Sequence, residues 1–81
     1  MTVQRVAVVG TGVIGISWAA HFLARGLDVV ASDPAPGAED RLCEGVAAIG
    51  PATSRLSFTA DPAEAAAQAD FVQENGPERE D

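Results

Sequence analysis

Six consecutive residues near the start of the chain have the spacing of a phosphate-binding turn. Three glycines recur in the pattern G-x-G-x-x-G, directly after an apolar segment and directly before a helical pattern. The first glycine of such a turn allows a tight bend, the second lets the backbone approach a diphosphate, and the third lets a helix pack closely on a sheet. The six residues are Gly10, Thr11, Gly12, Val13, Ile14 and Gly15.

An acidic residue follows at the distance expected for a dinucleotide site. Asp33 lies 18 residues after Gly15, near the spacing of about 20 residues at which a carboxylate accepts ribose hydroxyls. The diphosphate would meet free amides and the positive end of a helix dipole at Gly12–Ile14. A carboxylate repels a 2′-phosphate, and neither Arg nor Lys occurs between Arg25 and Arg41. We therefore predict NAD rather than NADP as the cofactor; FAD and a structural turn without a ligand are the alternatives.

Strand and helix patterns alternate along the chain, which predicts an α/β fold with a parallel sheet. The first two strands are nearly all apolar, as in central strands, whereas the third alternates apolar and polar residues, as in an edge strand. This difference favours the order 3-2-1-4, a Rossmann-type sheet of about four strands. We expect strands at 5–9, 27–32, 55–60 and 70–73, and helices at 13–25, 38–49 and 62–69.

The second expected helix carries its apolar residues on one face. Leu42, Val46 and Ile49 are spaced i, i+4 and i+7, which predicts that all three lie in the core. Cys43 is the only cysteine, so an internal disulfide is excluded, and we interpret it as a core thiol. A further helix start at 75–81 indicates the amino-terminal part of a longer domain, because so short a helix is not stable alone.

The overall charge argues against two classes of partner. Five basic residues stand against twelve acidic ones, a net charge of -7, which disfavours nucleic acid and anionic membranes. The segment 6–24 contains no charged residue, but its glycines and His21 fit neither a signal peptide nor a membrane span. We expect a soluble, cytoplasmic protein that binds small molecules and holds no metal.

A second stripe on the first helix is open to two interpretations. Ile14, Trp18, His21 and Arg25 lie about 100° from the face that packs on the sheet. The stripe is either the flank of the same core or a docking surface for a second domain or subunit, since Trp and Arg are common interface anchors. In a homo-oligomer, this stripe would form the contact between subunits. We do not interpret His21 as a catalytic base, because no carboxylate partner can be assigned to it.

Taken with the glycine turn and Asp33, the late segment DFVQENGPER at 70–79 resembles the 3-hydroxyacyl-CoA dehydrogenase family. The branch of lambda-crystallin and L-carnitine dehydrogenases is the one it resembles most, and GLDVVASDPAPGAE at 26–39 is also similar to carnitine dehydrogenases. The resemblance implies that the glycine turn and Asp33 bind NAD, and that Glu78 matches the family's acid near the nicotinamide-side ribose. The connection Gly50–Ser54 looks shorter than in that family, where a helical excursion is usual.

The family oxidises 3-hydroxy groups of acyl-CoA or small hydroxy acids by hydride transfer to NAD. Its catalytic His–Glu pair and its helical dimerisation domain would lie beyond residue 81, so we assign no catalytic residue within this chain. The leading hypothesis is the NAD-binding part of such a dehydrogenase, inactive on its own. The alternatives are a non-catalytic NAD-binding remnant or regulatory module that docks on a partner, and a dehydrogenase for another hydroxy acid or an imine.

Overall fold

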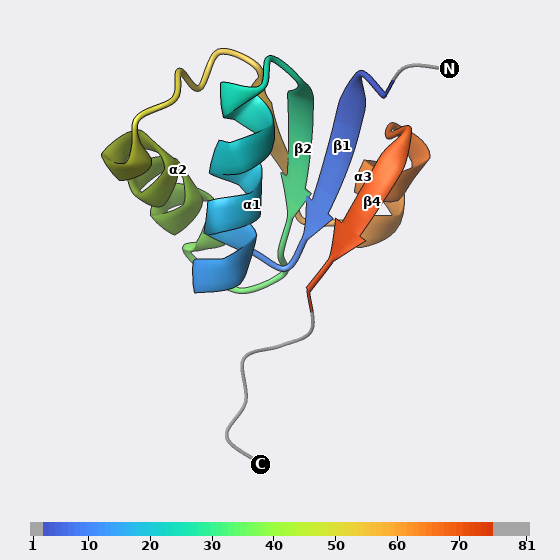
Figure 1. The fold of residues 1–81 in the computed structure, drawn as a ribbon. Coiled ribbons are helices and arrows are strands. Elements are labelled where there is room, and N and C mark those ends of the chain that lie inside the picture. The colour runs from blue at the N-terminus through green and yellow to red at the C-terminus, as the bar shows by residue number, and fades with distance from the viewer. Residues whose placement is uncertain (1–2, 76–81) are drawn as a thin grey trace.

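The computed structural model describes residues 3–75, over which strands and helices alternate (Figure 1). The connections between them are short, and every strand but the last is followed by a helix. The elements are β1 (Arg5–Val9), α1 (Val13–Ala24), β2 (Asp28–Ser32), α2 (Ala38–Ile49), β3 (Leu56–Thr59), α3 (Pro62–Ala67) and β4 (Phe71–Glu74).

The four strands form one parallel sheet in the order β3-β2-β1-β4, which confirms the predicted order. β1 and β2 lie in the middle, and their residues are buried from Val6 to Val8 and from Val29 to Ser32. β3 is an edge strand, as its alternating pattern predicted, and is only partly buried. The carboxyl ends of β1 and β2 are in register, since Val9 pairs with Ser32. The two loops that leave these strands therefore begin side by side.

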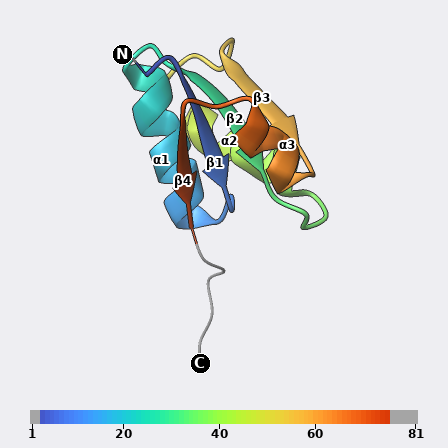
Figure 2. The ribbon, with the colours of Figure 1, turned by 90° about the vertical axis from the view of Figure 1, so that its right-hand side faces the viewer.

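Helices cover both faces of the sheet (Figure 2). α1 and α2 lie on one face, where they enclose the larger core cluster, and α3 lies on the other. Small residues let α1 approach the sheet, since Ala19 and Ala20 are both buried there. α2 contributes Leu42 and Val46, which are fully buried, and α3 contributes Ala65. The sheet and its two unequal layers thus hold the carboxyl end of β1 rigidly against the start of α1.

Two core assignments on α2 were wrong. Ile49 is 57% exposed, because it is the last residue of the helix and borders an open hollow beside α1. Cys43 is also exposed, since it follows the buried Leu42 and is rotated about 100° away from the inner face. Other differences are shifts of one or two residues at element ends. The helix start expected at 75–81 lies almost wholly outside the described residues.

No helix among residues 3–75 is long and apolar enough to cross a bilayer. The same residues contain no group of three or more His, Cys, Asp or Glu side chains placed to hold a metal ion.

A pair of substitutions on α2 tests this assignment of the core. Leu42→Ala should lower the free energy of unfolding by about 2–5 kcal/mol, because it leaves a cavity under α2. Ile49→Ala on the same helix should change it by only about 0.5 kcal/mol, the usual size of an exposed substitution. Urea unfolding followed by circular dichroism measures both. Equal losses for the two variants would contradict the burial described here.

Candidate cofactor site

The glycine turn joins β1 to α1 at the carboxyl edge of the sheet, at the lower end of both ribbons in Figure 1. The chain leaves β1 at Val9 and enters α1 at Val13. The Gly10 amide donates a hydrogen bond to the carbonyl oxygen of Ser32 at 2.8 Å, which ties the turn to the end of β2. The turn is therefore supported by both central strands before any ligand is considered.

Two glycines of the turn occupy positions that exclude any side chain. Gly10 has φ +91°, and a Cβ there would lie 2.7 Å from the carbonyl oxygen of Asn75. A Cβ at Gly15 would overlap the carbonyl oxygen of Gly10. Glycine at both positions thus lets the start of α1 close down on the turn, as the G-x-G-x-x-G pattern requires.

Asn75 is a positioning residue that the sequence analysis did not single out. Its backbone amide donates to the carbonyl of Val9 at 2.9 Å, and its side-chain Nδ2 donates to the carbonyl of Gly10 at 3.2 Å. Asn75 thereby fastens the end of β4 to the glycine turn. The available signal was its place directly after the last strand, at the edge of the sheet where the turn also lies.

The amino end of α1 is open and carries unsatisfied amides. The first helical hydrogen bond runs from the Ile16 amide to the Gly12 carbonyl at 2.9 Å, so the amides of the preceding residues have no acceptor within the helix. Within the described part of the chain, no side chain caps them and no acid occupies the first turn. Val13 is 71% exposed and Ile14 is 56% exposed, which leaves this end of α1 accessible. Free amides and the helix dipole together favour an anion here.

Asp33 lies directly beside the glycine turn, although 22 positions separate it from Thr11. Its Oδ2 accepts hydrogen bonds from the Thr11 amide at 2.8 Å and from the Thr11 hydroxyl at 3.1 Å. Its Oδ1 accepts from the Ala35 amide at 2.9 Å. Thr11 is only 4% exposed, so its own position is fixed by its surroundings. Its two hydrogen bonds therefore orient the Asp33 carboxylate.

These contacts keep Asp33 ionised. Partial burial raises the pKa of the carboxyl group, but the hydrogen bonds from Thr11 and Ala35, with the charge of Arg41, outweigh it. The pKa of Asp33 is consequently lowered below its ordinary value. An ionised carboxylate has about four acceptor positions, of which three are used here. One position remains on Oδ1, which is what a ribose hydroxyl needs.

The side chains of the second stripe on α1 take no part in these contacts. Glu78 lies outside the described residues. Ile14, Trp18, His21 and Arg25 are all exposed, so the interpretation of this stripe as the flank of the core was wrong. Trp18 stacks on Phe22, with ring centroids 5.4 Å apart, and His21 meets both rings edge-on.

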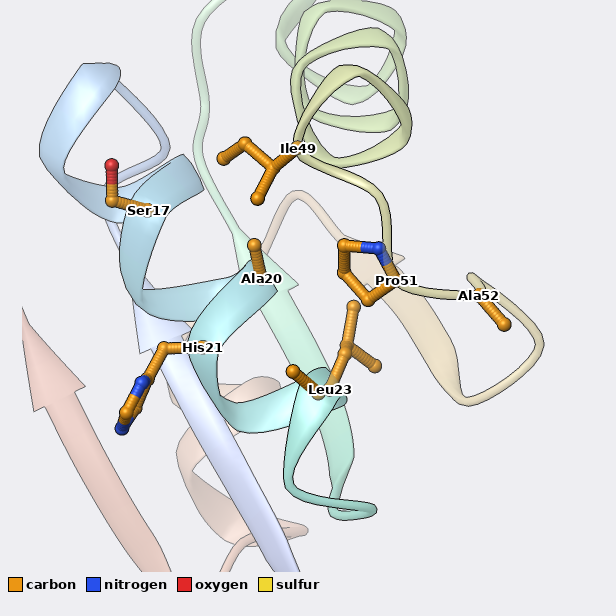
Figure 3. A pocket seen from close by; sticks show the side chains of 8 residues that line it. Ser17, Ala20, His21, Leu23, Ile49, Pro51 and Ala52 are labelled. Carbon is orange, nitrogen blue, oxygen red and sulfur yellow. The ribbon is translucent and has the colours of Figure 1, made fainter.

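A hollow of about 700 Å³ lies along α1 from Ser17 to Ala24, away from the glycine turn (Figure 3). Ile49 and Pro51 face α1 across it, whereas the His21 ring points away from them. Among the side chains that line it, only those of Ser17 and His21 are polar, and the Ser17 hydroxyl donates to the carbonyl of Val13 in its own helix. The hollow therefore lacks the convergent polar groups of a ligand site, which the glycine turn and Asp33 provide.

A substitution of Thr11 tests whether its hydroxyl orients Asp33. Thr11→Val preserves the shape and the backbone amide but removes the hydroxyl, so the pKa of Asp33 should rise toward its ordinary value. Thr11→Ser should leave it low. A carboxyl carbon NMR titration measures both. An unchanged pKa in Thr11→Val would contradict this role.

The same variant changes the dependence of stability on pH. Because the pKa of Asp33 is lowered in the folded chain, its stabilising effect is present above about pH 4 and is lost as the pH falls through the lowered value. Thr11→Val should therefore lose about 1 kcal/mol near neutral pH and less in acid. Urea unfolding at a series of pH values measures the difference in unfolding free energy between the unmodified chain and Thr11→Val. This difference should become smaller in acid. A difference that stays constant with pH would mean that Thr11 contributes through packing alone.

Comparisons with known proteins identify the family to which the chain belongs. A family model described as "3-hydroxyacyl-CoA dehydrogenase, NAD binding domain" matches residues 5–81. The L-carnitine dehydrogenase of Streptomyces griseus is 53% identical over 98% of this chain, and that of Bacillus cereus is 46% identical over 98%. A 3-hydroxyacyl-CoA dehydrogenase of Gibberella moniliformis is 45% identical over 95% of the chain. No solved structure matches significantly.

The relatives are longer than this chain in two respects. The chain spans 27–28% of their length, so most of each relative has no counterpart here. Moreover, the alignment with the Streptomyces griseus enzyme extends over 90 positions, and this chain has only 81 residues, so that enzyme carries at least nine additional residues within the aligned region. The match to the family model nevertheless covers nearly every residue. The chain belongs to the 3-hydroxyacyl-CoA dehydrogenase family, as the NAD-binding domain of that family.

Proposed function

We propose that this chain holds NAD for a dehydrogenase that oxidises the 3-hydroxy group of carnitine, a similar small hydroxy acid or a 3-hydroxyacyl-CoA. The names of the relatives support both substrate classes. The chain covers about a quarter of those proteins, so the substrate contacts belong to the part that has no counterpart here. Of these candidates we favour carnitine, since the carnitine enzymes include the relative with 53% identity.

The arrangement of the glycine turn and Asp33 suits a dinucleotide. The amides of Val13, Ile14 and Gly15 would bind the diphosphate, because they lack acceptors and the dipole of α1 favours a negative charge. The remaining acceptor position of Asp33 would take a hydroxyl of the adenosine ribose. Gly10, Gly12 and Thr11 would shape the turn between these two groups.

One observation carries the proposal: the Asp33 carboxylate is hydrogen-bonded to the glycine turn itself. Its Oδ2 lies 2.8 Å from the Thr11 amide, so the ribose acceptor and the diphosphate amides form a single rigid unit. A structural turn without a ligand would have no need of an ionised side chain with a spare acceptor position. FAD is not favoured by the family, which binds NAD.

NAD, when bound, accepts the hydride, and this chain's own residues bind and orient it. Neither the turn nor Asp33 is placed to remove a proton from a substrate, because both are committed to holding the cofactor. We assign proton removal to a His–Glu pair of the whole protein, and Glu78 to the nicotinamide-side ribose. The chain alone should therefore bind NAD and turn over no substrate.

A non-catalytic module is the second candidate function. Its supporting observation is that Trp18 is 37% exposed, within the exposed stripe on α1. In that case the chain would bind NAD and dock through this stripe on a second subunit or another partner. The net charge of -7 disfavours nucleic acid in either case. We propose a cytoplasmic location, where NAD and small hydroxy acids are both available.

Calorimetric titration with NAD tests the leading proposal. The unmodified chain should bind NAD, and Asp33→Asn should weaken binding about tenfold, because the charged acceptor for the ribose hydroxyl is lost. Glu44→Gln, an exposed residue on α2, removes one charge elsewhere and should leave affinity unchanged. A folded chain that gives no heat with NAD, or equal effects of the two substitutions, would refute the proposal.

Sedimentation analysis tests the docking alternative, which requires an assembly that Trp18→Ala disrupts.

A further inference from the structure

The guanidinium of Arg41 lies over the turn that follows Asp33. Arg41 is in the first turns of α2, yet its Nη1 donates a hydrogen bond back to the carbonyl of Pro36 at 3.1 Å. A Cβ at Gly37 would lie 3.0 Å from the same nitrogen. Gly37 has φ +76°, and the absence of its side chain leaves room for the guanidinium. Arg41 is thus held against the turn.

The same turn holds the Asp33 carboxylate. Oδ1 of Asp33 accepts from the Ala35 amide at 2.9 Å, one residue before the carbonyl that binds Arg41. A cation and an anion are consequently fixed at two ends of one five-residue turn. The charge of Arg41 also lowers the pKa of Asp33, which shows that the two groups influence each other.

The other arginines of the described residues lie elsewhere. Arg5 and Arg55 pair with Asp28 at the amino edge of the sheet, and Arg25 follows the carboxyl end of α1. Neither Arg nor Lys occurs between Arg25 and Arg41, which favours NAD over NADP. The turn nevertheless brings Arg41 itself back toward Asp33, the proposed ribose acceptor.

We propose that Arg41 is a specificity-determining residue: it is the cationic half of the ribose site and binds a 2′-phosphate once the opposing charge of Asp33 is removed. This inference rests on the proposed NAD function. In the unmodified chain the carboxylate repels the phosphate and accepts a hydroxyl, so NAD is preferred. Glu39 and Asp40, both exposed in the first turn of α2, add negative charge nearby and limit the affinity for a phosphate. The selectivity for NAD is therefore a balance of opposed charges on one turn.

A double-mutant cycle measured with both cofactors tests this inference. NADP binding should strengthen about tenfold in Asp33→Asn, and Arg41→Gln added to that variant should remove most of the gain. Arg41→Gln alone should weaken NADP binding about threefold and NAD binding by a smaller factor, because only NADP carries the 2′-phosphate. This single variant still tests the inference if Asp33→Asn does not fold. Arg25→Gln is the matched control, since it removes an exposed arginine distant from the turn and should change neither affinity.

Because binding of NAD and of NADP is measured separately, failure of this inference can be distinguished from failure of the proposed function. If the unmodified chain binds NAD but the gain in NADP binding persists fully in the double variant, Arg41 has no part in phosphate binding and the inference is overturned. It is also overturned if Arg41→Gln weakens NAD and NADP equally, because the residue would then act only on the shape of the turn. Absence of NADP binding in every variant would overturn it as well, whereas absence of NAD binding in the folded unmodified chain concerns the proposed function.

Discussion

The hydrogen bonds between Asp33 and Thr11 are the constraint on which the candidate site depends. They join the end of β2 to the turn after β1, and they are short only because β1 and β2 are adjacent and in register. A dinucleotide must satisfy a phosphate group and a ribose at a fixed separation. The glycine turn and Asp33 are already linked before a ligand binds. Less conformational entropy is therefore lost on binding than if the ligand had to bring them together. The topology of the sheet is therefore a direct part of recognition.

In the proposed site, an acidic protein would bind an anionic ligand through its backbone amides. The net charge is -7, yet the amino end of α1 carries no acid in its first turn among the described residues, and its amides face outward. The attraction comes from aligned peptide dipoles and acts over a short distance, so the overall charge opposes it only weakly across salt solution. This arrangement also explains why the site needs glycines: Gly10 and Gly15 let the backbone itself form the binding surface.

The parts of the structure that depend on local pattern were predictable, whereas those that depend on side-chain direction were not. Apolar runs and turn residues predicted the order of the strands and the place of Asp33 at their carboxyl edge. Ile49 was misassigned because helical periodicity does not show where a helix extends past the sheet, whereas the exposure of Cys43 follows from periodicity once Leu42 marks the inner face. The sequence signalled Asn75 only by its place after the last strand, and it gave no sign of Arg41, because each side chain binds a backbone carbonyl that only the folded turns bring near.

The two ends of α1 differ in how much change they can accept. At the amino end, a side chain at Gly10 or Gly15 would collide with backbone atoms, and Asp33 is held by three hydrogen bonds. At the carboxyl end, Ile49 and Pro51 border an open hollow, in the region where the sequence indicates a shortened connection. Residues that relatives carry in addition could be lost here without disturbing the glycine turn, because loops far from a rigid site tolerate changes in length. The separation of these two ends by the length of α1 allows the cofactor site to persist while the opposite edge of the domain varies.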